Sequence, residues 1–106
     1  TAIGNDYGYD QVFSRQVEGL CREGDVLIAI STSGNSTNIL NAVDTAQALR
    51  TKVIGFTGKT GGRLRGACDL ALVVPSDVTA RIQEMHIVMG HLLCALIEDE
   101  LGLDAD

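Results

Sequence analysis

The hydrophobic residues of this chain form short continuous runs that alternate with longer stretches of helical spacing. The runs lack the alternation of a half-exposed strand, so they predict three strands of a parallel sheet, the first of them buried on both faces and the second also buried. They cover residues 25–30, 52–57 and 70–74. Pro75 directly follows the last run and ends it, because proline cannot continue a ladder.

The helical spacing predicts three helices and one short helical turn. The helices cover residues 9–21, 37–49 and 76–102, and the turn covers residues 63–66. In the first helix the apolar stripe consists of Val12, Phe13, Val17 and Leu20. This alternation of strands and helices predicts one domain, residues 1–106, of the α/β class, with a parallel sheet between two layers of helices.

The loop at residues 31–36, Ser-Thr-Ser-Gly-Asn-Ser, connects the first buried run to the next helix. The first turn of a helix has unpaired N–H groups and a partial positive charge, so a helix capped by Ser36 or Asn35 offers an anion site. Gly34 has no Cβ to block a ligand. The hydroxyls that can donate to phosphate oxygens belong to Ser31, Thr32, Ser33 and Ser36.

The same residue types are also ordinary loop and capping residues, so a plain strand-to-helix connection is the alternative. No Gly-Lys-Ser/Thr follows the loop and it is not Gly-x-Gly-x-x-Gly, so nucleotide binding has no specific support. Lys59, in a second Gly-rich loop at the same edge of the sheet, is a further residue that could neutralise an anion.

Composition and charge narrow the function classes. The net charge of −6 argues against non-specific nucleic-acid binding, which needs a basic surface. No apolar run approaches the roughly 20 residues that span a bilayer, and the features of a signal peptide are missing, so we expect a cytoplasmic protein without membrane contact. The odd number of widely spaced cysteines favours reduced thiols; they are Cys21, Cys68 and Cys94.

Polar residues near the N-terminus and in the long helix complete the set of candidates. Asn5 and Asp6 lie in a turn-rich loop, where Asp6 could simply cap the following helix. In the long helix, the directions of His86 and His91 differ by about 140°, which argues against a metal shared between them, so hydrogen-bonded interface histidines are the alternative. The wide apolar face of this helix predicts packing against another subunit.

Four motifs in this order resemble sugar isomerase (SIS) domains, and among these phosphoheptose isomerases in particular. They are Gly4–Tyr9, Phe13–Glu18, Gly24–Ser36 and Ala80–Ile87, the last followed by His91. The resemblance implies part of a three-layer α-β-α sandwich of flavodoxin-like or Rossmann-like type. It also implies an isomerase that converts sedoheptulose 7-phosphate to D-glycero-D-manno-heptose 7-phosphate, for the heptose of surface glycans such as lipopolysaccharide.

The same resemblance implies roles for individual residues. Asn5, Asp6 and the hydroxyls of the 31–36 loop would contact substrate. Gln83 would contact substrate and one zinc ion, and His91 would bind zinc and move the proton. A homotetramer with sites between subunits is also implied. Eight residues on a straight helix rise about 12 Å, so Gln83 and His91 could meet at one metal only through leaning side chains or a bend.

The sequence departs from the family in one large respect. The family's catalytic carboxylate, its other zinc ligands and a Gly-Asn-Gly-Gly-Ser loop belong to an N-terminal half that has no counterpart here. A smaller departure is Thr79-Ala80, where some members carry an acidic residue. A SIS domain that senses a phosphosugar, or that serves as a scaffold for a protein such as a replication initiator, is therefore the alternative to an enzyme.

Overall fold

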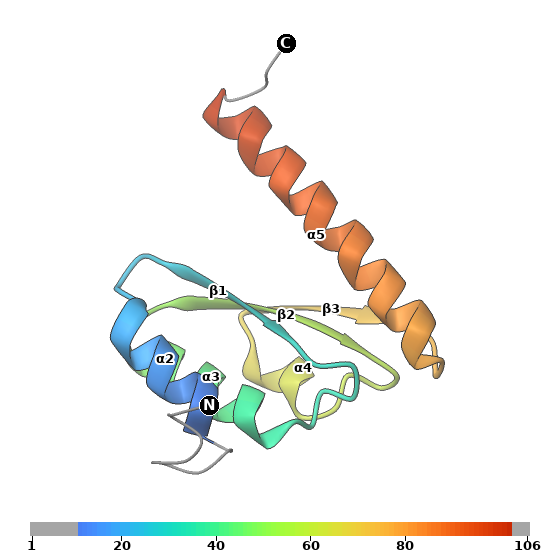
Figure 1. The fold of residues 1–106 in the computed structure, drawn as a ribbon, viewed down its shortest axis with the longest axis horizontal. Helices are drawn as coiled ribbons and strands as arrows, with labels where there is room; N and C mark the ends of the chain where they lie inside the picture. The colour runs from blue at the N-terminus through green and yellow to red at the C-terminus, as the bar shows by residue number, and fades with distance from the viewer. Residues whose placement is uncertain (1–10, 103–106) are drawn as a thin grey trace.

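Three parallel strands form the sheet at the centre of the fold (Figure 1). The structure, a computed structural model, describes residues 11–102. The strands lie side by side in chain order and comprise β1 (Val26–Ile30), β2 (Lys52–Gly58) and β3 (Leu70–Val74). All three predicted strands are confirmed, with shifts of one residue at the start of β1 and at the end of β2.

Helices cover the sheet from both sides (Figure 1). On one side lie α2 (Val12–Leu20), α3 (Thr37–Ala48) and α4 (Leu64–Ala67), and on the other lies α5 (Thr79–Leu101). This arrangement confirms the predicted α-β-α layers. Within the described residues α2 is shorter than predicted, and α5 begins at Thr79 because Ser76 holds a turn: its Oγ accepts the Val78 N–H at 3.0 Å.

The core lies between the sheet and α2, α3 and α4. Val43, Ala46 and Val53 are completely buried there, which contributes roughly 1.5–3 kcal/mol for each valine. The remaining buried members of this cluster are Val17, Ala29, Leu40, Ala42 and Leu64. This cluster therefore holds β1 and β2 in fixed positions against the three helices.

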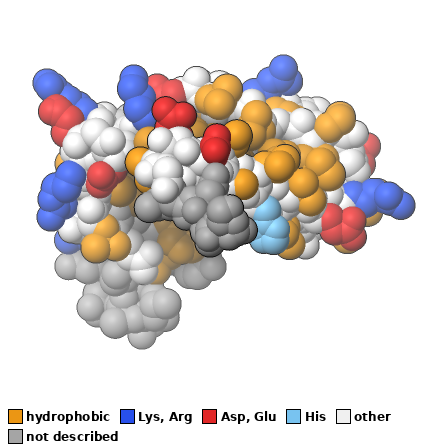
Figure 2. Space-filling view, turned by 90° about the horizontal axis from the view of Figure 1, so that it is seen from above, with side chains coloured by type: hydrophobic (Ala, Val, Ile, Leu, Met, Phe, Trp, Pro, Cys, Tyr) orange, Lys and Arg blue, Asp and Glu red, His pale blue; other side chains and the backbone are white. Residues whose placement is uncertain are grey.

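The other face of the sheet is only partly covered. In β1, Val26, Ile28 and Ile30 are 57%, 40% and 49% exposed, so the prediction that this strand is buried on both faces is wrong for the described part of the chain. The reason is that α5 packs on β2, through Ile82, and then leans away from the sheet (Figure 1). Figure 2, which looks onto this side, shows hydrophobic side chains gathered on the surface.

The apolar stripe of α2 is also only half buried. Val12 and Val17 are in the core, but Phe13 is 38% and Leu20 is 77% exposed, which corrects the predicted covering stripe. Phe13 and Leu20 line an apolar hollow of about 400 Å³ together with Ile28 of β1. The hollow exists because no described residue packs against this edge of the sheet.

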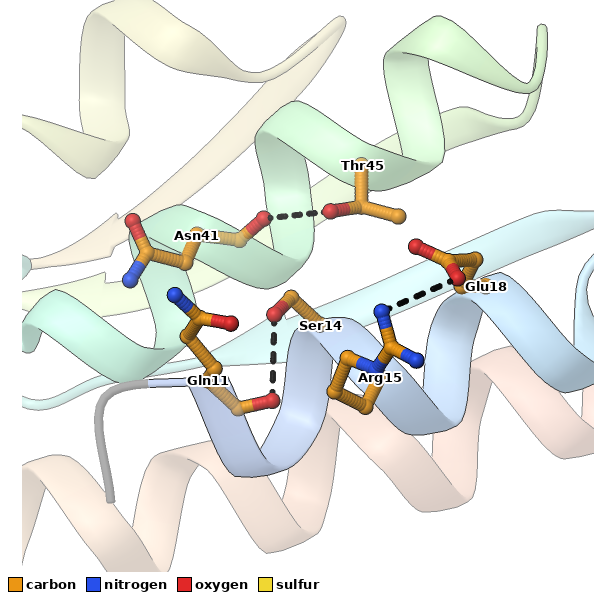
Figure 3. Close-up of polar contacts among 6 residues, drawn as sticks. All are labelled: Gln11, Ser14, Arg15, Glu18, Asn41 and Thr45. Atoms are coloured by element: carbon orange, nitrogen blue, oxygen red, sulfur yellow. Dashed lines mark hydrogen bonds and ion pairs between the residues drawn. The ribbon is translucent and has the colours of Figure 1, made fainter. Parts of the chain in front are cut away.

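Polar side chains line the outer junction of α2 and α3 (Figure 3). Ser14 is buried, and its hydroxyl donates to the Gln11 carbonyl oxygen at 3.1 Å, so its burial leaves no hydroxyl unpaired. The Thr45 hydroxyl donates to the Asn41 carbonyl oxygen at 3.0 Å. The Arg15 guanidinium lies 3.3 Å from the Glu18 carboxylate.

Cys21, Cys68 and Cys94 are free thiols. Burial raises the pKa of the Cys68 thiol, and the neighbouring Asp69 carboxylate raises it further.

In the part of the chain that the structure describes, no helix has the length and apolarity that a membrane crossing requires.

Candidate functional site

The 31–36 loop lies at the carboxyl end of β1 and leads into α3. The Ser31 N–H donates to the Phe56 carbonyl oxygen at 3.0 Å, which anchors the start of the loop to β2. Ser36 is the N-cap residue of α3, as predicted, but its side chain makes no capping hydrogen bond. The Ile39 N–H in the first turn of α3 donates to the Asn38 side-chain oxygen at 2.9 Å. The N–H groups of Thr37 and Asn38 are therefore the ones that can form an anion site at the start of α3.

The hydroxyls of this loop are partly used within the loop itself. Ser31 Oγ is buried, accepts the Gly34 N–H at 3.1 Å and lies 2.9 Å from Ser36 Oγ. If Ser31 donates to Ser36, the Ser36 hydroxyl hydrogen is left to donate outward. Ser33 Oγ accepts the Asn35 N–H at 3.1 Å, which also leaves its own hydrogen available. Thr32 is half-buried. The loop is thus held in shape by its own side chains while keeping donors for a ligand.

A second loop, residues 58–62, packs directly on the first. Gly34 has φ +74°, and a Cβ at Gly34 would lie 1.9 Å from the Gly61 carbonyl oxygen. Similarly, a Cβ at Gly62 would lie 2.4 Å from the Ser33 carbonyl oxygen. The Asn35 side-chain oxygen accepts the Arg63 N–H at 2.9 Å. The sequence did not indicate this contact between loops, although the adjacent glycines at 61 and 62 were the available signal.

Lys59 belongs to this second loop. Its side chain is exposed and its backbone N–H donates to the Ser76 carbonyl oxygen at 3.1 Å. A role for Lys59 in binding an anion stays a prediction.

The helix α5 brings one candidate close to this edge of the sheet. Gln83 is exposed and lines a hollow of about 370 Å³ together with Ile30, the last residue of β1. His91 is also exposed and lies eight residues further along the same helix, a rise of about 12 Å. Gln83 therefore lies next to the strand that leads into the 31–36 loop, whereas His91 lies more than two turns away along α5.

His86 has a different environment from His91. It is 5% exposed, and its Nε2 lies 2.9 Å from the Thr57 carbonyl oxygen. Its ring also contacts Phe56, with ring centroids 5.8 Å apart. His86 is therefore a hydrogen-bonded histidine of the protein interior. For His86 this agrees with the alternative given above, a hydrogen-bonded histidine and not a metal ligand. The sequence did not indicate its partner at the end of β2.

Comparisons with known proteins identify the family. The family model of the SIS domain matches residues 1–58, which is more than half of the chain. The chain belongs to the SIS domain family. This SIS domain is 60% identical over 102 residues to a phosphoheptose isomerase of Aliarcobacter butzleri, which covers 96% of the chain and 54% of that protein. It is 61% identical over 99 residues to a phosphoheptose isomerase of Nitratiruptor sp., with coverage of 93% and 53%.

Solved structures agree with this assignment. A phosphoheptose isomerase from Neisseria gonorrhoeae matches the SIS domain with a TM-score of 0.88 and 52% identity, over 91% of this chain and 55% of that one. One from Francisella tularensis matches with a TM-score of 0.89 and 48% identity, over 92% and 53%. These matches confirm the predicted fold as part of a SIS domain. The chain spans about half the length of the curated relatives that it matches.

The donors that the SIS domain presents do not by themselves fit a zinc site. Structural and catalytic zinc sites use at least three protein ligands, and no group of three or more His, Cys, Asp or Glu residues that could hold a metal is found within residues 11–102. Gln83 and His91 would supply two donors at most. Asn5 and Asp6, the other predicted contacts, lie outside the described residues.

Proposed function

We propose that this SIS domain carries part of the active site of a phosphosugar isomerase, and that the substrate is sedoheptulose 7-phosphate, converted to D-glycero-D-manno-heptose 7-phosphate. The observation that carries the proposal is the 31–36 loop, which presents hydroxyl donors at the uncapped start of α3. The high identity to proteins named phosphoheptose isomerase supports this choice among phosphosugars.

In this proposal the phosphate is bound by short-range contacts rather than by overall charge. The chain is acidic, with a net charge of −6, so attraction to an anion has to come from oriented N–H groups and hydroxyls. The first-turn amides of α3 and the hydroxyls of Thr32, Ser33 and Ser36 supply these donors. Ser31, which is buried, both holds the loop and fixes the orientation of Ser36.

The exchange between a ketose and an aldose requires a proton to leave one carbon and another to reach the neighbouring position. We assign one of these transfers to the imidazole of His91, and substrate orientation to Gln83, with Asn5 and Asp6 accepting hydrogen bonds from sugar hydroxyls. The exposure of His91 leaves its ring accessible to a substrate. We assign the second acid or base to the catalytic carboxylate that the resemblance places in the family's N-terminal half, outside residues 11–102.

Zinc and assembly belong to the proposal as well. Gln83 and His91 can contribute to a zinc site only if further ligands join them, and no step above depends on the metal. The cytoplasmic location and the homotetramer are likewise proposals that rest on the resemblance to phosphoheptose isomerases.

The test is turnover of sedoheptulose 7-phosphate by the full-length protein, with and without a chelator. We expect activity in the wild type and a loss of at least a hundredfold in His91→Ala, because removal of a positioned acid or base costs about 10²–10⁴ in rate. Cys94→Ala, a change on the exposed surface of the same helix, is the control and should have normal activity. Loss of activity with chelator and recovery with added zinc would support the metal. Normal turnover by His91→Ala would remove the catalytic assignment, and tight binding without turnover would favour the phosphosugar sensor.

A further inference from the structure

The contact between His86 and Thr57 ties α5 to the sheet. His86 is buried on the inner side of α5, and its Nε2 lies 2.9 Å from the carbonyl oxygen of Thr57 near the carboxyl end of β2. One turn earlier on the same helix, Ile82 packs on Gly58, where a Cβ would lie 2.5 Å from Ile82 Cδ1. Ile82 and His86 are the two buried residues of α5, so they dock its first half.

The bond to Thr57 determines which nitrogen of His86 carries the hydrogen. A carbonyl oxygen can only accept, so Nε2 must donate, and in the neutral ring Nδ1 then carries no hydrogen. Nδ1 is buried and has no hydrogen-bond partner among residues 11–102. His86 therefore uses its Nε2 hydrogen to hold the sheet, and the proposal below rests on this contact alone.

Thr57 in turn contacts the loops of the candidate site. Its hydroxyl donates to the Gly61 carbonyl oxygen at 3.4 Å. A Cβ at Gly34 would lie 2.8 Å from Thr57 Oγ1, so the backbone of the 31–36 loop rests against this side chain. Thr57 thus contacts α5 through its carbonyl oxygen and the two loops through its hydroxyl.

We propose that His86 is a positioning residue that holds α5, and with it Gln83, in a fixed place relative to the 31–36 loop, acting through Thr57. Gln83 precedes His86 by three residues, lines the same hollow as His86 and borders Ile30 at the end of β1. Its position at that edge depends on how the first half of α5 docks. The consequence for phosphosugar binding rests on the proposed function, whereas the mechanical link between α5 and the loop does not.

Hydrogen–deuterium exchange on the full-length protein tests the mechanical link. In His86→Phe an aromatic ring remains but the donor to Thr57 is lost. We expect amide exchange to become about tenfold faster at residues 79–89 and at residues 31–36, because a tenfold change corresponds to the loss of about one net hydrogen bond. In His86→Gln the side-chain amide can place an N–H near the position of Nε2, and exchange should stay within about twofold of wild type. Glu84→Gln, an exposed change on the same turn, is the control.

The outcomes separate the two ideas. Unchanged exchange at residues 31–36 in His86→Phe, or a His86→Gln variant that behaves like His86→Phe, would overturn the positioning role. If His86→Phe does not fold, His86→Asn replaces it, because the shorter amide cannot reach Thr57. In turnover assays we expect kcat/KM to fall about tenfold in His86→Phe and to recover in His86→Gln. A wild type without phosphosugar turnover or binding would refute the proposed function, and the exchange data would still decide the role of His86.

Discussion

Ser31 differs from the other hydroxyl residues of its loop because it is almost fully buried. Its Oγ meets both the Gly34 N–H and the Ser36 hydroxyl, so this residue links the shape of the loop to the direction of a neighbouring donor. Ser33 is half-buried and its oxygen accepts the Asn35 N–H. At the scale of single residues, the loop therefore combines a buried structural serine with serines whose hydroxyl hydrogens are available for the proposed ligand.

We expect Ser31→Ala combined with Ser33→Ala to weaken phosphosugar binding by about 1–3 kcal/mol. The Ser33 change removes a hydrogen bond to the charged group, and the Ser31 change removes the partner that orients the Ser36 hydroxyl. Calorimetric titration of the full-length protein with sedoheptulose 7-phosphate measures this. Ser14→Ala is a suitable control, because it removes a buried serine hydroxyl from α2 and not from the loop. An unchanged affinity in the double variant would exclude Ser33 from phosphate binding and Ser31 from orienting Ser36.

At the scale of elements, the contact between the 31–36 loop and the 58–62 loop gives a sharp stability prediction. Gly34→Ala would place a Cβ 1.9 Å from the Gly61 carbonyl oxygen in a residue with φ +74°. We expect the free energy of unfolding to fall by about 3 kcal/mol, since both strain and overlap have to be relieved. Urea denaturation of the full-length protein measures this.

Gly19→Ala provides the matched control for that substitution. Gly19 lies in α2, and a Cβ there would meet nothing within 4 Å. Alanine is the better helix former by up to about 1 kcal/mol, so this variant should be as stable as wild type or slightly more stable. A Gly34→Ala protein as stable as Gly19→Ala would show that the two loops do not pack closely in solution.

The comparison between sequence and structure also depends on the kind of element. Continuous apolar runs located all three strands, although only β2 is paired on both sides and the apolar residues of β1 and β3 are partly exposed. The start of α5 was predicted too early, because Ser76 bonds to the Val78 N–H and keeps the chain in a turn. Local hydrogen bonds of this kind compete with helix formation and are hard to foresee from periodicity.

At the scale of the whole molecule, the sequence predicted where the candidate site lies but not how it is held together. The order of strands and helices placed the 31–36 loop at the carboxyl edge of a parallel sheet, where ligands of such folds bind. The pairing of Gly34 with Gly61 and of His86 with Thr57 joins residues 27 to 29 positions apart in sequence, so no local pattern indicates them. The exposed face of β1 was missed because hydrophobicity alone does not show which helix covers it.

The exposed apolar side chains of α5 carry the last prediction, which concerns assembly. Met85, Val88, Leu92 and Leu96 are spaced three or four residues apart along one stripe and are 44%, 47%, 59% and 66% exposed. An apolar stripe of this size stabilises an interface when another subunit covers it. We therefore expect Leu96→Lys to weaken self-association of the full-length protein at least tenfold, measured by analytical ultracentrifugation. Glu98→Gln is the control, because it changes the charge by the same amount at a position away from the stripe, and it should leave association unchanged. Equal association of the wild type, Leu96→Lys and Glu98→Gln would exclude α5 from the interface.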